Sequence, residues 1–283
     1  MVDALAGHTI VMSGGSRGIG LAIAVAAGRR GANVVILAKS DRPDPRLPGT
    51  VHTAVAEIEA AGGQALAVVG DVRVEDDVER AVAQAVQRFG GIDIVVNNAS
   101  ALNLSGTADL PLKRYDLMQQ INSRGTFLLV RSALPHLRTS GRGRILTLSP
   151  PLNLGPQWIG KFPAYSLSKF GMTILTLGFA AEFADDGIAA NCLWPETTIA
   201  TAAVANLLGG SDAIARARDP QIMADAAVAV LDLPADRTGN TFFDVEVLAE
   251  AGVSDLSRYG GGPDPELDLF VDRRISPAEV PAP

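Results

Sequence analysis

A glycine-rich turn near the beginning of the chain constrains the fold more than any other feature. A short apolar run at residues 9–12 leads into the sequence Ser-Gly-Gly-Ser-Arg-Gly-Ile-Gly, and a helical stretch follows at residues 21–30. In such a strand–turn–helix unit, glycines let the backbone approach a pyrophosphate, and the free amides at the start of the helix offset its charge. The alternative is a turn with a structural role alone. We expect nucleotide contacts from Ser13, Gly14, Ser16, Arg17, Gly18, Ile19 and Gly20.

Apolar runs and helical stretches go on alternating along the rest of the chain. Strands separated by helices of about ten or more residues pair in parallel, with ligands at the carboxyl ends of the strands. We therefore predict an α/β fold in a single domain, with a doubly wound, parallel, seven-stranded sheet of the Rossmann type. Further strands are expected at 34–38, 65–70, 93–96, 144–148, 189–194 and 241–245, and further helices at 50–61, 74–89, 111–137, from 165 onward and at 223–231.

The composition changes near the C-terminus. Residues 260–283 are rich in glycine and proline. We expect one dinucleotide-binding and catalytic domain over residues 1–259, followed by a C-terminal tail over residues 260–283. The tail contains a short apolar stretch at 267–271, and its last residues, 277–283, are expected to be flexible.

The overall composition excludes several functional classes. The chain has 283 residues, 47% of them hydrophobic, which suffices for a large core. No run of about 18 apolar residues lacks charges, and the N-terminus has no secretory signal. The net charge of −7 argues against nucleic acid as a partner. One cysteine, Cys192, excludes an internal disulfide, and His8, His52 and His136 lack metal-ligand spacing. We expect a cytoplasmic protein without a membrane span or a metal site.

The pentad Tyr165-Ser-Leu-Ser-Lys169 places a phenol and an ammonium four residues apart. On a helix these residues share one face, with Cβ atoms about 5–6 Å apart. A phenol with a pKa of about 10 is a weak base at neutral pH, and a positive charge about 4 Å away is worth roughly 3 pKa units. We therefore expect Lys169 to lower the pKa of Tyr165, and Tyr165 to act as a general acid–base. The alternative is an ordinary amphipathic helix with a surface lysine.

The ends of the second and third strands bear on the choice of nucleotide. A carboxylate after the second strand favours NAD, whereas a cation there accommodates the 2′-phosphate of NADP. Lys39 holds this position and Arg17 offers a second positive charge, so NADP(H) is favoured. Asp41 nearby keeps NAD(H) as the alternative. Asp71, followed by Val72, ends the third strand and is expected to accept a hydrogen bond from the adenine amine.

The motifs together resemble one known family. With Asn97-Asn98-Ala99 after the fourth strand and Asn122 in the helix at 111–137, they occur in the order and spacing of the short-chain dehydrogenase/reductase family, over roughly residues 5–247. Residues 38–40, 149–154 and 193–195 are most similar to its hydroxysteroid dehydrogenase-like branch. The bacterial relatives of that branch include dehydrogenases of isoprenoid alcohols such as citronellol.

The resemblance implies a nicotinamide-dependent oxidoreductase. Tyr165 would exchange a proton with the substrate oxygen, and Lys169 would also hold the nicotinamide ribose. Asn122 would hold a water that links Lys169 to solvent, and Ser149 matches the first serine of the family's doublet after strand five. The residues that would further line the cofactor site are Asn98, Ala99, Tyr165, Lys169 and Pro195.

Three positions depart from the family pattern. Pro150 stands where the second serine of the doublet polarises the substrate oxygen, and proline has neither a hydroxyl nor a backbone donor. Asn153 is a candidate substitute. Ser100 replaces a glycine after strand four, and Glu196 replaces a glycine after strand six. The Glu196 carboxylate is therefore expected near the nicotinamide face, unless it points into solvent.

Apolar residues dominate the segments expected over the active site, which favours a hydrophobic alcohol, aldehyde or ketone of isoprenoid, fatty or steroid-like kind. An alternative follows from Pro150: a cofactor-binding, weakly catalytic sensor or scaffold of the same fold. By family analogy, the apolar helices favour a homodimer or homotetramer. The apolar residues in question are Leu152, Leu154, Trp158, Ile159, Phe162, Ile199, Val204, Leu207 and Leu208.

Overall fold

A sheet of seven parallel strands forms the centre of the computed structural model, which describes residues 5–44, 49–207 and 210–274. The strand order is β3-β2-β1-β4-β5-β6-β7, so the direction of winding reverses between β1 and β4. This order confirms the predicted doubly wound sheet of the Rossmann type. The strands are β1 (Thr9–Ser13), β2 (Asn33–Ala38), β3 (Gln64–Val69), β4 (Ile94–Asn97), β5 (Arg144–Leu148), β6 (Ala189–Trp194) and β7 (Thr241–Phe243).

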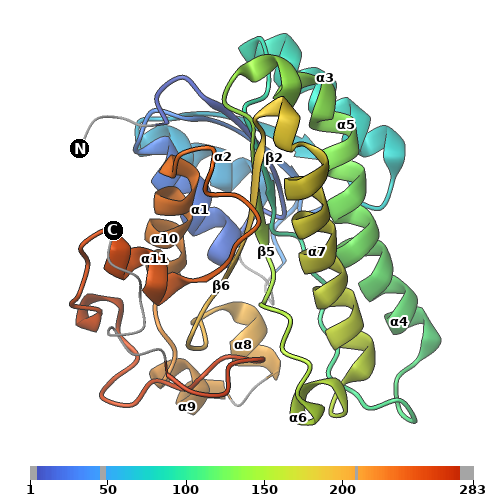
Figure 1. Cartoon of the computed structure of the whole chain (residues 1–283), viewed down its shortest axis with the longest axis vertical. Coiled ribbons are helices and arrows are strands. Elements are labelled where there is room, and N and C mark those ends of the chain that lie inside the picture. Colours follow the sequence, from blue (N-terminus) through green and yellow to red (C-terminus); the bar gives the residue numbers. More distant parts are fainter. Residues whose placement is uncertain (1–4, 45–48, 208–209, 275–283) are drawn as a thin grey trace.

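Helices cover both faces of the sheet, as Figure 1 shows. On one face α1 (Gly18–Gly28), α2 (Val51–Ala60), α10 (Gln221–Asp232) and α11 (Asp244–Glu250) enclose one apolar core. On the other face α3 (Glu75–Phe89), α4 (Leu112–Met118), α5 (Gly125–Ser140) and α7 (Pro163–Glu182) lie, and α3, α5 and α7 enclose a second core. Strands β1, β5 and β6 are buried along their whole length, which explains their nearly continuous apolar sequences.

The predicted helix at 111–137 contains an irregular turn. Between α4 and α5 the backbone forms a π-helix, η1 (Gln119–Arg124), which includes Asn122 and ends just before Gly125. A Cβ atom added to Gly125 would lie 3.0 Å from Cγ1 of Val72, so a larger residue here would require the Val72 side chain to shift. Asparagine and glycine are weak helix formers, and here they mark the place where the regular helix is interrupted.

Two details of the sequence-based prediction need correction. The seventh strand was expected over residues 241–245, but it ends at Phe243 and α11 begins at Asp244. The Glu246 carboxylate accepts a hydrogen bond from the Phe243 backbone amide at 2.8 Å, which stabilises the start of the helix. Short helices also lie after β5 and β6: α6 (Pro156–Ile159), α8 (Ala202–Leu207) and α9 (Gly210–Ala215).

The C-terminal chain returns across the carboxyl ends of the strands. Leu267 forms an antiparallel bridge with Thr197, and the Thr198 amide donates to the Glu266 carbonyl at 2.8 Å. In Figure 1 this part of the chain passes below the sheet, beside α8 and α9. We call residues 266–272 the strap. The division of the chain at residue 259 stays a prediction, and residues 277–283, where flexibility is expected, lie outside the described residues.

No helix in the described part of the chain combines the length and the apolar character that crossing a membrane requires.

Candidate active site

A cleft of about 970 Å³ opens at the carboxyl ends of β1 to β4, where the strand order reverses. A crevice at this position is where doubly wound sheets bind nucleotides. The structure brings most of the predicted cofactor residues together in its wall: Gly14, Ser16, Arg17, Gly18, Ile19, Gly20, Lys39, Asp71, Val72, Asn98 and Ala99.

The glycine-rich turn is packed tightly against the end of β4. Gly14 has a φ of 77°, and a Cβ atom added to it would lie 2.9 Å from the Cα atom of Ala99. A Cβ atom added to Gly20 would lie 2.4 Å from Nδ2 of Asn98, which itself donates to the Gly14 carbonyl at 2.8 Å. These positions therefore need glycine, and the bare backbone they leave suits the close approach of a pyrophosphate.

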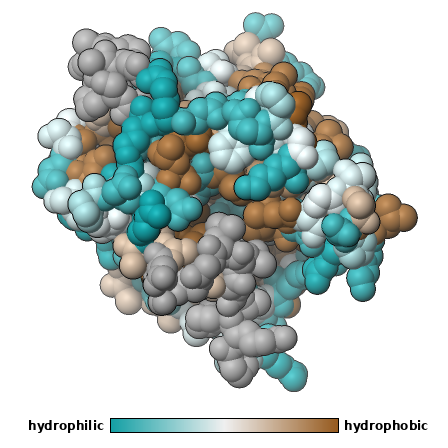
Figure 2. All heavy atoms as spheres, turned by 90° about the horizontal axis from the view of Figure 1, so that it is seen from below, coloured by the Kyte–Doolittle hydropathy of each residue, from teal (hydrophilic) through white to brown (hydrophobic). Residues whose placement is uncertain are grey.

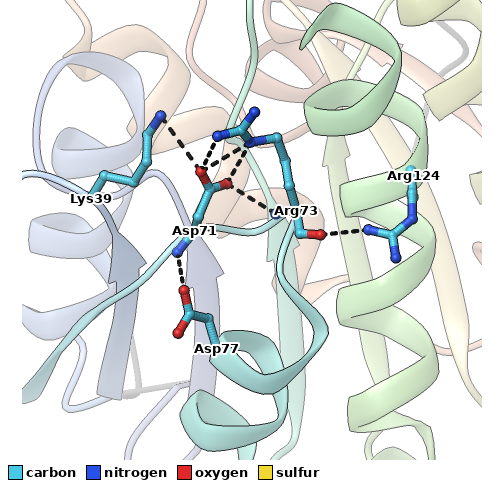
Figure 3. A network of polar contacts seen from close by, with 5 residues as sticks. All are labelled: Lys39, Asp71, Arg73, Asp77 and Arg124. Atoms are coloured by element: carbon cyan, nitrogen blue, oxygen red, sulfur yellow. Dashed lines mark hydrogen bonds and ion pairs between the residues drawn. The ribbon is translucent and has the colours of Figure 1, made fainter. Parts of the chain in front are cut away.

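A polar network surrounds Asp71 at the adenine end of the cleft (Figure 3). Arg73 Nη2 donates to Asp71 Oδ2 at 2.6 Å, and Lys39 Nζ lies 3.7 Å from the same oxygen. Burial raises the pKa of Asp71, but the hydrogen bonds from Arg73 and the Lys39 charge outweigh it and leave the pKa below its usual value. Both Asp71 oxygens already accept from Arg73, whose carbonyl accepts from Arg124 at 2.6 Å.

Arg17 joins the glycine-rich turn to the end of β2. Its Nη2 atom donates to Ser40 Oγ and to the Gly49 carbonyl, each at 2.8 Å. Lys39 and Ser40 line the same cleft. The cleft wall at the end of β2 thus carries two cations and a hydroxyl, with Lys39 paired to Asp71. The Asp41 carboxylate is turned to His52, 2.8 Å from its Nε2 atom.

Tyr165 and Lys169 lie one turn apart on α7, and both are buried, with 5% and 3% of their surface exposed. Lys169 Nζ donates to the Leu148 carbonyl at 2.6 Å and lies 4.8 Å from the centre of the Trp194 ring. Burial lowers the pKa of Lys169 to about 7. Burial, with the nearby Asp268 charge, raises the pKa of Tyr165 above its ordinary value. The tyrosine pKa is thus raised rather than lowered in this arrangement, because burial and the Asp268 carboxylate both disfavour the charged phenolate.

Asn122 connects three segments around the same helix. Its Oδ1 atom accepts from the Ala101 amide at 2.7 Å, and its Nδ2 atom donates to the Ala101 carbonyl at 3.0 Å and to Ser168 Oγ at 2.9 Å. The side chain therefore ties η1 to the loop after β4 and to α7.

Ser149 and Asn153 have different surroundings. The Ser149 hydroxyl is fully buried and has no hydrogen-bond partner among the described residues. Asn153 Nδ2 donates to the Phe270 carbonyl at 2.9 Å and to Asp272 Oδ2 at 2.7 Å. The expectation that Asn153 substitutes for the missing second serine is therefore not met, because its donor holds the strap. The polar neighbour of the Ser149 hydroxyl is the buried thiol of Cys192.

Glu196 does not take the alternative orientation into solvent. Only 4% of its surface is exposed, and its Oε2 atom lies 3.7 Å from Nη1 of Arg274. Its position near a nicotinamide stays a prediction.

Four predicted cofactor residues lie outside the wall of the cleft: Ser13, Tyr165, Lys169 and Pro195. Ser13 Oγ accepts from the Asn98 and Ala99 amides at 3.3 and 3.2 Å, so it supports the turn from behind. Ser40 and Thr201 were not among the predicted cofactor residues, but they also line the cleft. Their places shortly after β2 and β6 could have indicated this, because residues that follow a parallel strand lie at the carboxyl edge of the sheet, where ligands bind.

Of the apolar residues expected over the site, Phe162 and Trp158 pack in an aromatic cluster with the strap, and Val204 lines a small pocket beside it. Leu152, Leu154 and Ile159 are exposed, and Ile199 belongs to the core under α1 and α10. The side chain of Leu207, and Leu208 as a whole, lie outside the described part of the structure. Figure 2 views the face that carries α6, α8 and α9, where hydrophobic patches alternate with hydrophilic residues.

The family model for short chain dehydrogenase matches residues 8–210. The chain belongs to the short-chain dehydrogenase family. It is 51% identical over 270 residues to hydroxysteroid dehydrogenase-like protein 2 of Danio rerio, and 50% identical over the same length to that of Xenopus tropicalis. These matches cover 95% of this chain but 65% and 64% of the relatives, so the chain spans a little under two thirds of their length.

Solved structures agree with this assignment. A putative dehydrogenase from Xanthomonas campestris is 52% identical, with a TM-score of 0.92, and the match covers 95% of this chain and 99% of that one. A short chain dehydrogenase from Mycobacterium thermoresistibile is 53% identical, with a TM-score of 0.91, covering 99% of this chain and 100% of that one. Two further neighbours are 25% identical. An NADH-dependent reductase in complex with NAD has a TM-score of 0.70, and the match covers 86% of this chain and 97% of that one. A short-chain oxidoreductase in complex with NADP has a TM-score of 0.69, and the match covers 85% of this chain and 97% of that one. The cleft therefore belongs to a fold that binds a nicotinamide cofactor.

Proposed function

We propose that this short-chain dehydrogenase is an NADP(H)-dependent oxidoreductase that converts a hydrophobic alcohol to its carbonyl compound or the reverse. One observation carries the proposal: Tyr165 and Lys169 lie one helical turn apart, Tyr165 in an aromatic cluster and Lys169 against the Trp194 ring of the same cluster, in a chain whose cleft fits a dinucleotide. Resemblance to hydroxysteroid dehydrogenase-like proteins supports a substrate with a large apolar part.

The chain's own residues divide the chemistry between them. A bound nicotinamide cofactor would supply the hydride exchange with the alcohol or carbonyl carbon. Tyr165 takes the proton from the alcohol oxygen, or gives it back to the carbonyl oxygen. Ser149, whose buried hydroxyl lacks another partner among the described residues, donates to that same oxygen. Lys169 holds the nicotinamide ribose, and its pKa of about 7 lets it exchange a proton near neutral pH.

Three groups support a preference for NADP(H) over NAD(H). Arg17, Lys39 and Ser40 together offer two positive charges and a hydroxyl at the end of β2, where the 2′-phosphate lies. Asp41, the residue that favours NAD(H), is engaged with His52 instead.

Apolar side chains on α4, α5 and α7 support self-association as a homodimer or homotetramer. Leu112 is 78% exposed, Leu167 55%, Ile174 59% and Phe127 46%. Exposed apolar residues on neighbouring helices are typical of a contact surface. The substitution Ile174→Glu should shift the sedimentation coefficient toward that of a monomer, whereas Val69→Glu, at the sheet edge, should leave it unchanged.

A second candidate function is favoured by Pro150 and by the raised pKa of Tyr165. In it the protein binds the cofactor as a weakly catalytic sensor or scaffold. Turnover of terpenoid, fatty and steroid alcohols with NADP⁺, and of the matching carbonyl compounds with NADPH, separates the two. We expect reduction or oxidation of at least one class. Tight NADPH binding without turnover of any compound would instead establish the second function.

A further inference from the structure

Phe270 occupies the space directly beside the proposed acid–base. Its ring is stacked on the Tyr165 ring, with centroids 6.1 Å apart and an interplanar angle of 23°. Phe162 and Phe170 lie at 5.8 and 5.0 Å, and Trp194 at 6.2 Å. Phe270 itself is 2% exposed. Phe270, a side chain from the strap, thus fills an aromatic cage that includes Tyr165.

The backbone of Phe270 is held in an unfavourable conformation. Its φ is 70°, and no other non-glycine residue among those described has a positive φ. A bulky residue in this region is strained unless its surroundings hold it there. The ring contacts in the cage therefore offset the free-energy cost of this backbone conformation, and the closed strap remains strained at Phe270.

Hydrogen bonds anchor the strap on both sides of Phe270. After it, Asp272 accepts from Asn153 at 2.7 Å and from Gln157 and Trp158 at 2.8 Å. Before it, Trp194 Nε1 donates to the Leu269 carbonyl at 2.9 Å. Three of the four donors belong to the loop and short helix after β5, and the fourth to the end of β6.

The space beside the closed strap is too small for a large substrate. A pocket of about 190 Å³ lies there, lined by Leu104, Phe162, Val204 and the strap residues Leu267 and Leu269, among others. Pockets for drug-sized ligands measure about 300–1,000 Å³. Tyr165 is also almost fully buried. The strap must therefore move before such a substrate reaches Tyr165.

We propose that Phe270 is an intramolecular competitor of the substrate, and that the strap opens for alcohols or carbonyl compounds whose apolar, branched or unsaturated group replaces the Phe270 ring in the aromatic cage. The inference rests on the proposed function for the identity of the reacting group. Beyond that function, the inference identifies where the apolar part of the substrate binds and which segment excludes small polar alcohols. A small alcohol cannot refill the cage, so it cannot offset the loss of the ring contacts.

The proposal has a quantitative form. If the strap is open in a fraction f of the molecules, the apparent dissociation constant of the substrate is the intrinsic constant divided by f. For a strap that is open in about one molecule in ten, removing the competitor lowers the apparent constant about tenfold. Removing the competitor should therefore increase the affinity greatly for an apolar ligand and only slightly for a short one.

The chain provides its own optical probe for the test. It contains two tryptophans, Trp158 and Trp194, and both contact Phe270 and donate to the strap. Acrylamide quenching of their fluorescence therefore reports whether the strap is closed, without any turnover. Citronellol serves as the apolar probe ligand and 1-propanol as the short one, each titrated in the presence of NADP⁺.

Two strap variants and one control are compared with the wild type. Phe270→Ala removes the competing ring, and Asp272→Ala removes the acceptor of three side-chain hydrogen bonds. Asp236→Ala is the control, since Asp236 is exposed in the turn before β7, toward the amino ends of the strands, whereas the strap crosses their carboxyl ends. We expect both strap variants to be quenched at least twofold more strongly and to bind citronellol about tenfold more tightly. The control should match the wild type in both quenching and citronellol affinity. The affinity for 1-propanol should differ little among the proteins.

Unchanged quenching and unchanged citronellol affinity in both strap variants would overturn the proposal. An equal gain for 1-propanol would refute the assigned ligand class. If Phe270→Ala fails to fold, Asp272→Ala decides, because it leaves the aromatic cage intact. Tighter citronellol binding without turnover of any alcohol would support the strap as a competitor and refute the oxidoreductase function, so the two failures are distinguishable.

Discussion

The Lys169 ammonium nitrogen lies 2.6 Å from the carbonyl oxygen of Leu148, the last residue of β5. The side chain is thus anchored to the strand end and covered by the Trp194 ring. Its pKa of about 7 follows from burial, and the pKa of Tyr165 is raised rather than lowered. The Asp268 charge, from the strap, raises the pKa of Tyr165 and partly offsets the effect of burial on the pKa of Lys169.

Replacing Tyr165 by phenylalanine should remove proton transfer while keeping the fold. Phenylalanine retains the ring that stacks on Phe270. Because general acid–base catalysis contributes about 10²–10⁴-fold, kcat should fall by that factor, with NADPH affinity within about twofold of the wild type. Steady-state kinetics and NADPH fluorescence titration measure the two quantities. Undiminished kcat would refute the role given to Tyr165.

Replacing Ser149 by alanine should separate catalysis from stability. The hydroxyl is buried without a hydrogen-bond partner among the described residues, so its loss should leave the free energy of unfolding unchanged or slightly higher. If the hydroxyl donates to the substrate oxygen, kcat/KM should fall about tenfold or more. Urea unfolding and kinetics on the same preparation test both statements. A loss of stability with normal kcat/KM would show a structural role.

Replacing Lys39 by alanine tests the cofactor preference. An ionic contact with the 2′-phosphate is worth roughly 1.5–3 kcal/mol, so the Kd for NADPH should rise tenfold or more while that for NADH stays constant. Lys113→Ala is the matched control, since Lys113 is exposed on α4 away from the cleft. Equal Kd values for NADPH in wild type and Lys39→Ala would favour NAD(H) as the cofactor.

Asp244 provides a prediction on pH and stability. It is fully buried, and burial raises its pKa to about 7 although the Glu196 and Val245 amides donate to it. Its stabilising contribution is complete below pH 3.8, the ordinary value, and is lost as pH rises to about 7. Asn cannot titrate, so Asp244→Asn should gain stability relative to the wild type over this range, by up to about 4 kcal/mol.

Urea unfolding of both proteins at pH 4.5, 6 and 8 measures the difference. A difference that is constant across these values would show that Asp244 does not titrate in this window.

Much of the fold follows from the sequence, because it depends on patterns that are local. The apolar runs of β5 and β6 were predicted with the observed bounds, and Asn122 with Gly125 marked the site of the π-helix. The end of β7 was missed because it depends on a side-chain contact, from Glu246 to the Phe243 amide. Periodicity carries no information on such contacts.

The candidate site was less accessible to sequence reasoning. The residues of the nucleotide cleft follow strand ends, so topology alone brings them together. The position of Phe270 on Tyr165 joins segments that are distant in the chain, and no local pattern encodes it. The direction of the Tyr165 pKa was missed for the same reason, since it depends on burial by that distant segment and on the charge of Asp268. The catalytic roles themselves stay predictions.

The π-helix has a consequence for how the two ends of the cleft are supported. Arg124, the last residue of the π-helix, donates a hydrogen bond to the Arg73 carbonyl, and the Arg73 side chain donates to the Asp71 carboxylate. Two residues earlier, Asn122 is bonded to Ser168 on the helix of Tyr165. One short turn of backbone therefore supports both the Asp71 side of the nucleotide cleft and the helix that carries Tyr165. An inserted or deleted residue there would displace both together.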